Sequence, residues 1–248
     1  MAHNYRPVVK NKILQVFKLS ENVSGSDLNL LEEISTQEKI SAKKFIFYES
    51  DQLIDLYGLA EGEVHLLRQL ANGQEVIIDR ILPGEFFGLN SLLAGSAVTL
   101  SARTAQDSTV IKIPKKPFLD LMKKNVKLNM RMMKKMSDRL KEANCMMTIL
   151  SLGDVEKQLA AVIWKEYVHH QDLGNKQPVF QLTRLNLAQM AGSTVETTIR
   201  ILKKWEKEGL VNFPKRGQFK IKNLEKFKNL SVIAHTICCQ NAVNQKAA

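Results

Sequence analysis

Cysteine is scarce in this chain of 248 residues, where only Cys145, Cys238 and Cys239 occur. So few cysteines do not favour the disulfide framework of small secreted domains, and their spacing does not match a zinc site. We interpret Cys145 as a small apolar residue. The adjacent pair near the C-terminus has no assigned role, and a redox function there is the minor alternative because exposed thiols are reactive.

Long hydrophobic runs and catalytic motifs are also missing. No stretch approaches the ~18 apolar residues of a membrane-spanning helix, and residues 1–19 lack the apolar core of a signal peptide. We therefore expect a cytoplasmic protein with no membrane partner. The chain has no nucleophile elbow, no phosphate-binding glycine loop and no paired histidine and carboxylate, so we expect no enzyme and assign no catalytic residue. His169 and His170 are interpreted as residues of a polar loop rather than metal ligands.

Positive charge, in contrast, is in excess. The net charge is +11 and the isoelectric point is about 9.5, which favours a polyanionic partner. Residues 154–248 hold 15 Lys and Arg against 8 Asp and Glu, so they carry +7 of this total and residues 1–153 carry +4. The basic excess is therefore concentrated in the C-terminal part.

Short strand-like runs dominate the first half of the chain. Residues 11–40 predict one or two helices, after which the hydrophobic period changes to two. Turn signals separate the following runs, and Asn72-Gly73 is a strong hairpin signal. This pattern predicts a small β-barrel or sandwich. The predicted strands cover residues 45–47, 56–59, 64–67, 76–78, 101–104 and 109–113.

A long helix follows, at about residues 126–152, after a short one at 118–124. Its apolar residues alternate spacings of three and four over nearly four heptads, which favours a dimeric coiled coil over packing within the domain alone. Dimerisation and packing within the domain can occur together. Met130, Met132, Met146 and Ile149 lie off this seam and could pack on the strands. The seam consists of Val126, Asn129, Met133, Met136, Leu140, Ala143, Met147 and Leu150.

The helix pattern breaks at residues 151–154, which we take as a hinge and domain boundary, with Asp154 placed to cap a helix over 155–168. A polar loop at 169–175 and a short strand at 179–182 are predicted next. The run 210–221 predicts a hairpin with Lys215 and Arg216 at its tip, where they would contact phosphates.

Residues 182–211, which connect the predicted strand to the predicted hairpin, predict two short helices joined by a tight turn. Gly192 suits a left-handed turn conformation, and Ser193 or Thr194 can cap the second helix. Together with the predicted hairpin at 210–221, these two helices predict a winged helix-turn-helix domain.

Glu196 and Arg200 lie one turn apart near the start of the second helix. Arg can pair with guanine O6 and N7, Glu can accept from the cytosine amino group, and Lys203 and Lys204 can meet phosphates. The alternative is an ordinary exposed ion pair between Glu196 and Arg200.

The order of these parts resembles the cyclic-AMP receptor protein/FNR (Crp/Fnr) family of bacterial transcription regulators. The motifs are Leu182-Thr183-Arg184, the run 192–200 (GSTVETTIR) and the run 81–88 (ILPGEFFG), and the resemblance covers about residues 12–230. It implies an α+β fold with a cyclic-nucleotide-binding-like β-roll (jelly roll) at 1–125, a dimerisation helix at 126–152, a winged helix-turn-helix at 153–230 and a tail at 231–248.

The resemblance also implies a homodimer that reads a palindrome with TGA-type half-sites in double-stranded DNA and contacts RNA polymerase. Val195 and Ile199 would touch neighbouring bases or thymine methyl groups. Thr183, Arg184 and Lys203 would contact the sugar-phosphate backbone of the DNA. The full set of expected DNA-binding residues is Thr183, Arg184, Ser193, Thr194, Val195, Glu196, Thr197, Ile199, Arg200, Lys203, Lys204, Lys215 and Arg216.

The chain departs from the family in its effector site. The position of the Glu that binds ribose is Leu89, and the Arg-Ser pair that binds the cyclic phosphate falls near Ser96, with no arginine between Arg80 and Arg103. A buried phosphate would lack its guanidinium partner, which argues against cyclic AMP. The expected pocket residues are Gly88, Leu89, Asn90, Ser91, Ser96 and Thr99.

The sequence leaves several alternatives to cyclic AMP. The four-cysteine iron–sulfur cluster of the FNR branch is excluded, because no cysteine precedes Cys145. Haem on His65 is possible, although a histidine in a strand is more often simply packed, and constitutive DNA binding needs no effector. The alternative function is a ligand-sensing or protein-interaction module whose helix-turn-helix does not read DNA sequence.

Overall fold

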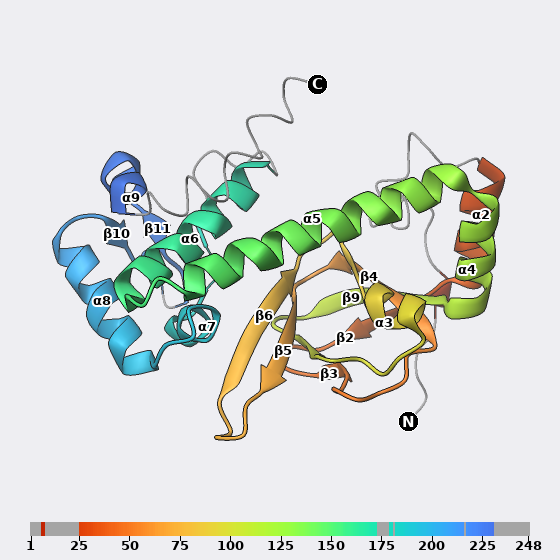
Figure 1. The fold of residues 1–248 in the computed structure, drawn as a ribbon, viewed down its shortest axis with the longest axis horizontal. Coiled ribbons are helices and arrows are strands. Elements are labelled where there is room, and N and C mark those ends of the chain that lie inside the picture. Colours follow the sequence, from red (N-terminus) through yellow and green to blue (C-terminus); the bar gives the residue numbers. More distant parts are fainter. Residues whose placement is uncertain (1–5, 8–24, 173–178, 181, 216, 231–248) are drawn as a thin grey trace. The chain divides into compact units, whose positions relative to one another are not determined.

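The computed structural model describes residues 6–7, 25–172, 179–180, 182–215 and 217–230 (Figure 1). The chain forms two compact units, Met1–Lys135 and Met136–Ala248, so their boundary lies inside the long helix α5, Val126–Leu150. The first unit is rich in strands, and the second is mainly helical. None of the helices in the described residues has the length and hydropathy that a bilayer crossing requires.

The first unit contains two antiparallel sheets. A five-stranded sheet has the order β1-β2-β9-β4-β7, and a four-stranded sheet has the order β3-β8-β5-β6. All six predicted strands are present, and Asn72-Gly73 connects β5 to β6 in a hairpin as expected. The strands are β1 Arg6–Pro7, β2 Thr36–Ile40, β3 Phe45–Phe47, β4 Asp55–Glu61, β5 Val64–Gln69, β6 Glu75–Ile81, β7 Phe86–Phe87, β8 Ser101–Thr104 and β9 Ser108–Pro114.

The central strands of the larger sheet are apolar on both faces. In β4, Tyr57 and Leu59 enter a core shared with the smaller sheet, whereas Leu56 and Ala60 enter a second core beneath the helices. This alternation follows from the two-residue period of a strand. The helices that contribute to the second core are α2 Gly25–Ile34, α3 Leu89–Ala94, α4 Lys115–Lys124 and the start of α5.

The N-terminal prediction was wrong in part. Residues 36–40 form β2, not a helix, because they pair with β9 in an unbroken antiparallel register. Residues 8–24 lie outside the described part of the chain. Helix α4 begins at Lys115, three residues earlier than expected, because Pro117 falls in the first helical turn, where its missing N–H needs no partner.

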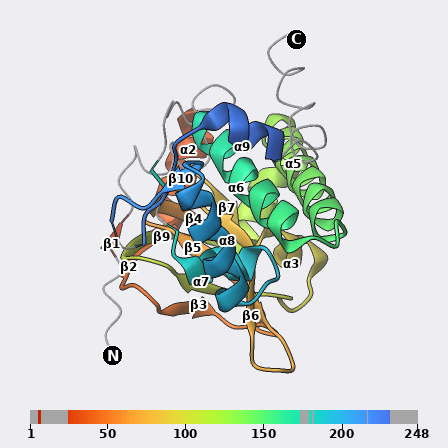
Figure 2. The ribbon, with the colours of Figure 1, turned by 90° about the vertical axis from the view of Figure 1, so that its left-hand side faces the viewer.

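The helices and short strands of the second unit (Figure 2) contribute to one core that is rich in aromatic side chains. Trp205, Phe180, Phe219 and Phe227 are fully buried in it, and Cys145 also lies there, although it is disulfide-bonded rather than a simple apolar filler. The elements are the end of α5, α6 Val155–Asp172, α7 Arg184–Met190, α8 Val195–Lys207, β10 Val211–Asn212, β11 Lys220–Ile221 and α9 Leu224–Leu230.

Two local predictions for this unit were wrong. Helix α6 continues through Asp172, so His169 and His170 are helical rather than part of a loop. The expected strand at 179–182 is reduced to a single bridge between Phe180 and Phe219, whose rings stack with centroids 4.6 Å apart. The packing of these two rings, which are distant in sequence, holds that segment in place.

Gly62 lies at a backbone position with no room for a side chain. It turns the chain between β4 and β5 at φ +96°, and an added Cβ would lie 2.3 Å from Ser108 Oγ and 2.6 Å from the Asp107 carbonyl oxygen. The Ser108 hydroxyl is fixed in turn, since it accepts from the Glu63 N–H and donates to the Gln106 carbonyl.

We expect Gly62→Ala to lower the free energy of unfolding by about 3 kcal/mol, because left-handed strain and a steric clash add together. Gly73→Ala is the control. Gly73 also has positive φ, +80°, but its Cβ would meet nothing within 4 Å, so only the strain of about 1 kcal/mol should appear. Urea unfolding measures both variants, and equal losses would contradict the role of the Ser108 contact.

Candidate nucleic-acid interface

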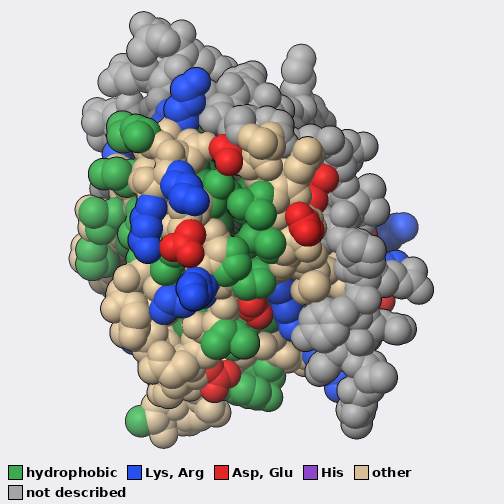
Figure 3. Space-filling model, turned by 90° about the vertical axis from the view of Figure 1, so that its right-hand side faces the viewer, with side chains coloured by type: hydrophobic (Ala, Val, Ile, Leu, Met, Phe, Trp, Pro, Cys, Tyr) green, Lys and Arg blue, Asp and Glu red, His purple; other side chains and the backbone are tan. Residues whose placement is uncertain are grey.

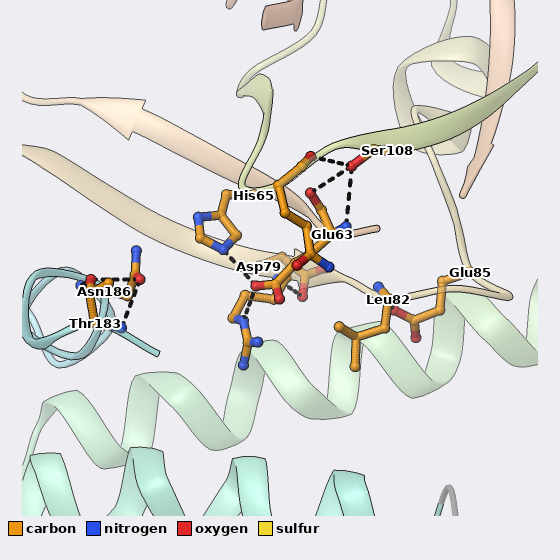
Figure 4. A network of polar contacts seen from close by, with 10 residues as sticks. Glu63, His65, Asp79, Leu82, Glu85, Ser108, Thr183 and Asn186 are labelled. Atoms are coloured by element: carbon orange, nitrogen blue, oxygen red, sulfur yellow. Dashed lines mark hydrogen bonds and ion pairs between the residues drawn. The ribbon is translucent and has the colours of Figure 1, made fainter. Parts of the chain in front are cut away.

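Helices α7 and α8 form the predicted helix-turn-helix. Thr183 caps α7: its hydroxyl accepts from the Asn186 N–H at 3.1 Å, and the Asn186 side chain accepts from the Thr183 N–H (Figure 4). Gly192 makes the turn at φ +61°, and Thr194 caps α8 by accepting from the Thr197 N–H at 3.2 Å. The turn therefore uses the residues that the sequence indicated.

Helix α8 has one buried and one exposed face. Thr198, Ile201, Leu202 and Trp205 are buried against the rest of the unit. On the opposite face Glu196, Arg200 and Lys203 are exposed.

Glu196 and Arg200 do not form the ion pair that was the alternative interpretation. Within the described residues neither side chain has a hydrogen-bond or ion-pair partner. Both charged groups are thus free to meet an external ligand beside the N-terminus of a 13-residue helix.

Other candidate residues surround this pair unevenly. Val195, Thr197 and Ile199 are half-buried on α8, and Thr194 is exposed. Ser193 is buried, with its side chain 3.5 Å from the Thr194 carbonyl oxygen. The surface around the start of α8 therefore combines exposed charged and hydroxyl groups with the partly exposed apolar side chains of Val195 and Ile199.

Lys204 differs from Lys203 because it already has a partner. Its ammonium group donates to both carboxylate oxygens of Glu156, at 2.9 and 3.0 Å. These hydrogen bonds raise the pKa of Lys204. Sequence reasoning placed Lys204 with the phosphate contacts and did not find Glu156, which lies 48 residues away.

The hairpin β10–β11 is shorter than predicted but has the expected antiparallel register, Val211 with Ile221 and Asn212 with Lys220. At its tip Lys215 is exposed, and Arg216 lies outside the described residues. The guanidinium of Arg184, at the start of α7, lies over the Phe213 ring, 4.8 Å from its centroid. This cation–π contact joins the hairpin to the helix-turn-helix.

Two of the expected effector-pocket residues, Gly88 and Leu89, lie against apolar side chains. Leu89 is only 2% exposed and packs with Leu92 and Phe86 in the core under the helices. Gly88 caps α3 at φ +85°, and an added Cβ would lie 2.9 Å from Leu53 Cδ1. No carboxylate therefore occupies the position where nucleotide-binding relatives are expected to hold ribose.

The polar residues of this region offer no buried anion site among the described residues. Asn90, Ser96 and Thr99 are exposed, and Ser91 is half-buried. The Arg68 guanidinium donates to the Thr99 carbonyl at 2.6 Å and lies 3.5 Å from the Glu49 carboxylate. The right-hand face of the molecule, in its described part, mixes hydrophobic, basic and acidic side chains rather than showing a patch of one charge (Figure 3).

His65 belongs to a buried ionic network. Glu63 Oε1 lies 2.7 Å from His65 Nε2 and accepts from Arg80 Nε at 2.8 Å, and each of the three side chains is at most 8% exposed (Figure 4). Because Nε2 faces a carboxylate, the geometry does not favour His65 as an axial haem ligand. Among the described residues, no group of three or more His, Cys, Asp or Glu could hold a metal ion.

The same network shifts the ionisation of Glu63. Burial alone raises its pKa, but the hydrogen bonds and charges of His65 and Arg80 outweigh burial and lower the pKa to about 2. A carboxyl group whose pKa is lowered by folding stabilises the fold at pH values above its ordinary pKa of 4.5. This contribution is lost as the pH falls towards the folded-state pKa of about 2.

Each unit of the chain contains a segment that matches a known protein family. Residues 37–125 match the Cyclic nucleotide-binding domain family, and residues 157–230 match the Crp-like helix-turn-helix domain family. The Cyclic AMP receptor protein of Thermus thermophilus is 32% identical over 168 residues, which cover 68% of this chain and 76% of that protein. The Fumarate and nitrate reduction regulatory protein of Salmonella typhi is 29% identical over 198 residues, or 79% of this chain and 77% of that protein.

Solved structures agree on the fold. FixK2 from Bradyrhizobium japonicum has a TM-score of 0.69 at 21% identity and covers 79% of this chain and 97% of its own. A CooA mutant from Carboxydothermus hydrogenoformans has a TM-score of 0.67 at 17% identity and covers 92% of this chain and 98% of its own. At these identities the likeness establishes the architecture alone.

We expect Glu63→Gln to lower the free energy of unfolding by about 3 kcal/mol at neutral pH, following from the lowered pKa. The difference from the unsubstituted protein should fall by more than half between pH 5 and pH 3. Glu75→Gln is the control: Glu75 pairs with Arg103 at 2.7 Å but is 28% exposed, so its loss should be about 1 kcal/mol or less. Urea unfolding across this pH range measures both, and a pH-independent difference would contradict the network.

Proposed function

Because this chain belongs to the Crp/Fnr family of bacterial transcription regulators, and is thus a DNA-binding regulator, we propose that it binds a palindromic site as a homodimer. The observation that carries this proposal is the exposed face of α8, where Glu196 and Arg200 have no partner within the described residues. A TGA-type core in each half-site supplies the bases that such a pair can read.

The chemistry of the two side chains supports base reading. Arg200 presents a planar guanidinium that can donate to guanine O6 and N7, and Glu196 can accept from a cytosine amino group. The half-buried Val195 and Ile199 beside them offer apolar contact to thymine methyl groups. Thr183, Arg184, Lys203 and Lys215, at the rim of this surface, would contact phosphates and set the register of the domain.

The long helix α5 supports a dimer. Along the heptad seam Val126, Met133 and Leu140 are exposed by 73, 62 and 63%, and Met136, Ala143, Met147 and Leu150 are exposed as well. Asn129 differs, since its amide donates to the Met122 carbonyl at 2.8 Å. An apolar stripe of this length on a single chain marks an interaction surface. A parallel pair of such helices would place two recognition helices ~34 Å apart, one turn of DNA.

We further propose that any small effector differs from cyclic AMP. Leu89 places an apolar side chain where a ribose-binding carboxylate would be needed, and Arg68, near Thr99, is engaged by a carbonyl and a carboxylate. Charge-assisted hydrogen bonds to a cyclic phosphate therefore have no obvious donor. Contact with RNA polymerase is proposed from the regulatory function alone.

We expect Arg200→Ala to weaken binding to a cognate duplex by about 1–3 kcal/mol, while binding to a scrambled duplex changes little. The reason is that base contacts carry sequence information and phosphate contacts do not. Fluorescence anisotropy of a labelled palindrome with TTGAT-type half-sites and of a scrambled duplex, at two salt concentrations and with and without cyclic AMP, measures this difference.

Each other outcome of that measurement has a meaning. Equal losses of Arg200→Ala on both duplexes would reject base reading by Arg200. Binding that depends on cyclic AMP would overturn our interpretation of Leu89. No preference for the palindrome under any condition would favour a sensing or protein-interaction module.

We expect Leu140→Glu to dissociate the dimer, raising its dissociation constant at least ~100-fold, because each protomer would bury a charge in an apolar seam. Lys141→Glu is the matched control, since Lys141 is exposed on the same helix but lies off the seam. Sedimentation equilibrium separates the two. A dimer that survives Leu140→Glu would place the interface elsewhere.

A further inference from the structure

A single carboxylate near the start of α6 contacts two neighbouring residues of the recognition helix. Glu156 Oε1 accepts from the indole Nε1 of Trp205 at 2.8 Å and from Lys204 Nζ at 2.9 Å, while its Oε2 accepts from Lys204 Nζ at 3.0 Å. The side chain of Glu156 is 28% exposed and that of Lys204 is 54% exposed. The contact therefore lies at the edge of the core, partly open to solvent.

The indole fixes this carboxylate in place. Trp205 is fully buried, and a buried indole N–H needs an acceptor. Glu156 is that acceptor, so it cannot turn away without leaving the indole N–H unpaired. Its second oxygen is then directed at Lys204, the residue before Trp205.

The pair is selective for Lys204. Arg200 lies one helical turn before Lys204, on the same stripe, and has no carboxylate partner in the described part of the chain. Two other carboxylates act on Lys204 at longer range: Glu208, one turn later at the C-terminal end of α8, and Asp154, which accepts from the Glu156 N–H at 2.9 Å at the start of α6.

Space is available for Lys204 to leave this pair. An open cavity of about 450 Å³ is lined by Thr197, Arg200, Ile201 and Lys204 of α8 and by residues 153–156. Because Lys204 lines this opening and is more than half exposed, its ammonium group can swing from Glu156 towards solvent or an external anion.

We propose that Glu156 is a positioning residue that limits the positive charge α8 presents to DNA. It holds Lys204 in an ion pair, so that Lys204 does not contact phosphate and sequence-independent affinity stays low. Glu196 and Arg200, which carry sequence information, are left unpaired. This inference rests on the proposed role of α8 as the recognition helix.

Glu156→Gln tests the inference, because the amide oxygen can still accept from Trp205 while the negative charge is removed. Freed Lys204 would then neutralise one more phosphate per protomer. The slope of log affinity against log salt should become steeper by about 0.9 per protomer, or about 1.8 for the homodimer, which adds about a 12-fold loss between 50 and 200 mM salt. The change should be the same on cognate and scrambled duplexes.

Two further variants isolate the cause. Adding Lys204→Met to Glu156→Gln should return the slope to that of the unsubstituted protein. Glu206→Gln, which removes an exposed carboxylate of the same helix, should leave the slope unchanged. An unchanged slope in Glu156→Gln would overturn the proposal, as would a steeper slope that persists without Lys204, since that would reflect repulsion between Glu156 and phosphate.

A second measurement does not depend on DNA. The pKa of Lys204, followed by NMR at its side-chain carbon Cε, should fall in Glu156→Gln, while the Trp205 indole N–H signal stays near its original position. An unchanged Lys204 titration would contradict the pairing itself. Failure of the unsubstituted protein to bind any duplex would reject the proposed function instead, and the lysine titration would then decide whether the positioning contact exists.

Discussion

The buried face of α8 is the contact on which the C-terminal unit depends. An isolated helix of 13 residues is marginal in water, so its order must come from packing. Trp205 supplies much of that packing: it is fully buried and meets the Phe227 ring edge-to-face, with centroids 5.5 Å apart. Because one stripe of the helix is committed to the core, the opposite stripe can carry charges that the fold itself does not use.

The first unit shows how apolar packing can define a fold without defining a ligand. Residues 37–125 match the Cyclic nucleotide-binding domain family, and the strands of this unit supply its two cores from apolar positions with a two-residue period. Such positions do not require any particular ligand. Leu89 is buried in one of the two cores, and the buried ionic groups Glu63, His65 and Arg80 pair with one another.

Local signals in the sequence were sufficient for most elements and for the exposed α8 pair. Hairpin and turn residues such as Asn72-Gly73 and Gly192 act on their immediate neighbours, and helical periodicity marks which side of α8 is buried. The misses were non-local. Strand β2 has little apolar pattern and exists because β9 pairs with it, and Glu156 meets Lys204 only after α6 and α8 have packed. Local sequence patterns do not show which distant residue will become the partner in such a contact.

Helix α5 contributes buried side chains to a core near each of its ends, and its middle part has none. Leu128 and Met132 belong to the core of the first unit, Cys145 and Ile149 belong to that of the second, and no residue from 133 to 144 is buried within the single chain. The helix is continuous over 25 residues, about 37 Å. Within a single chain, residues 133–144 therefore pack in neither hydrophobic core, and their helical conformation is held by the backbone hydrogen bonds of α5 itself.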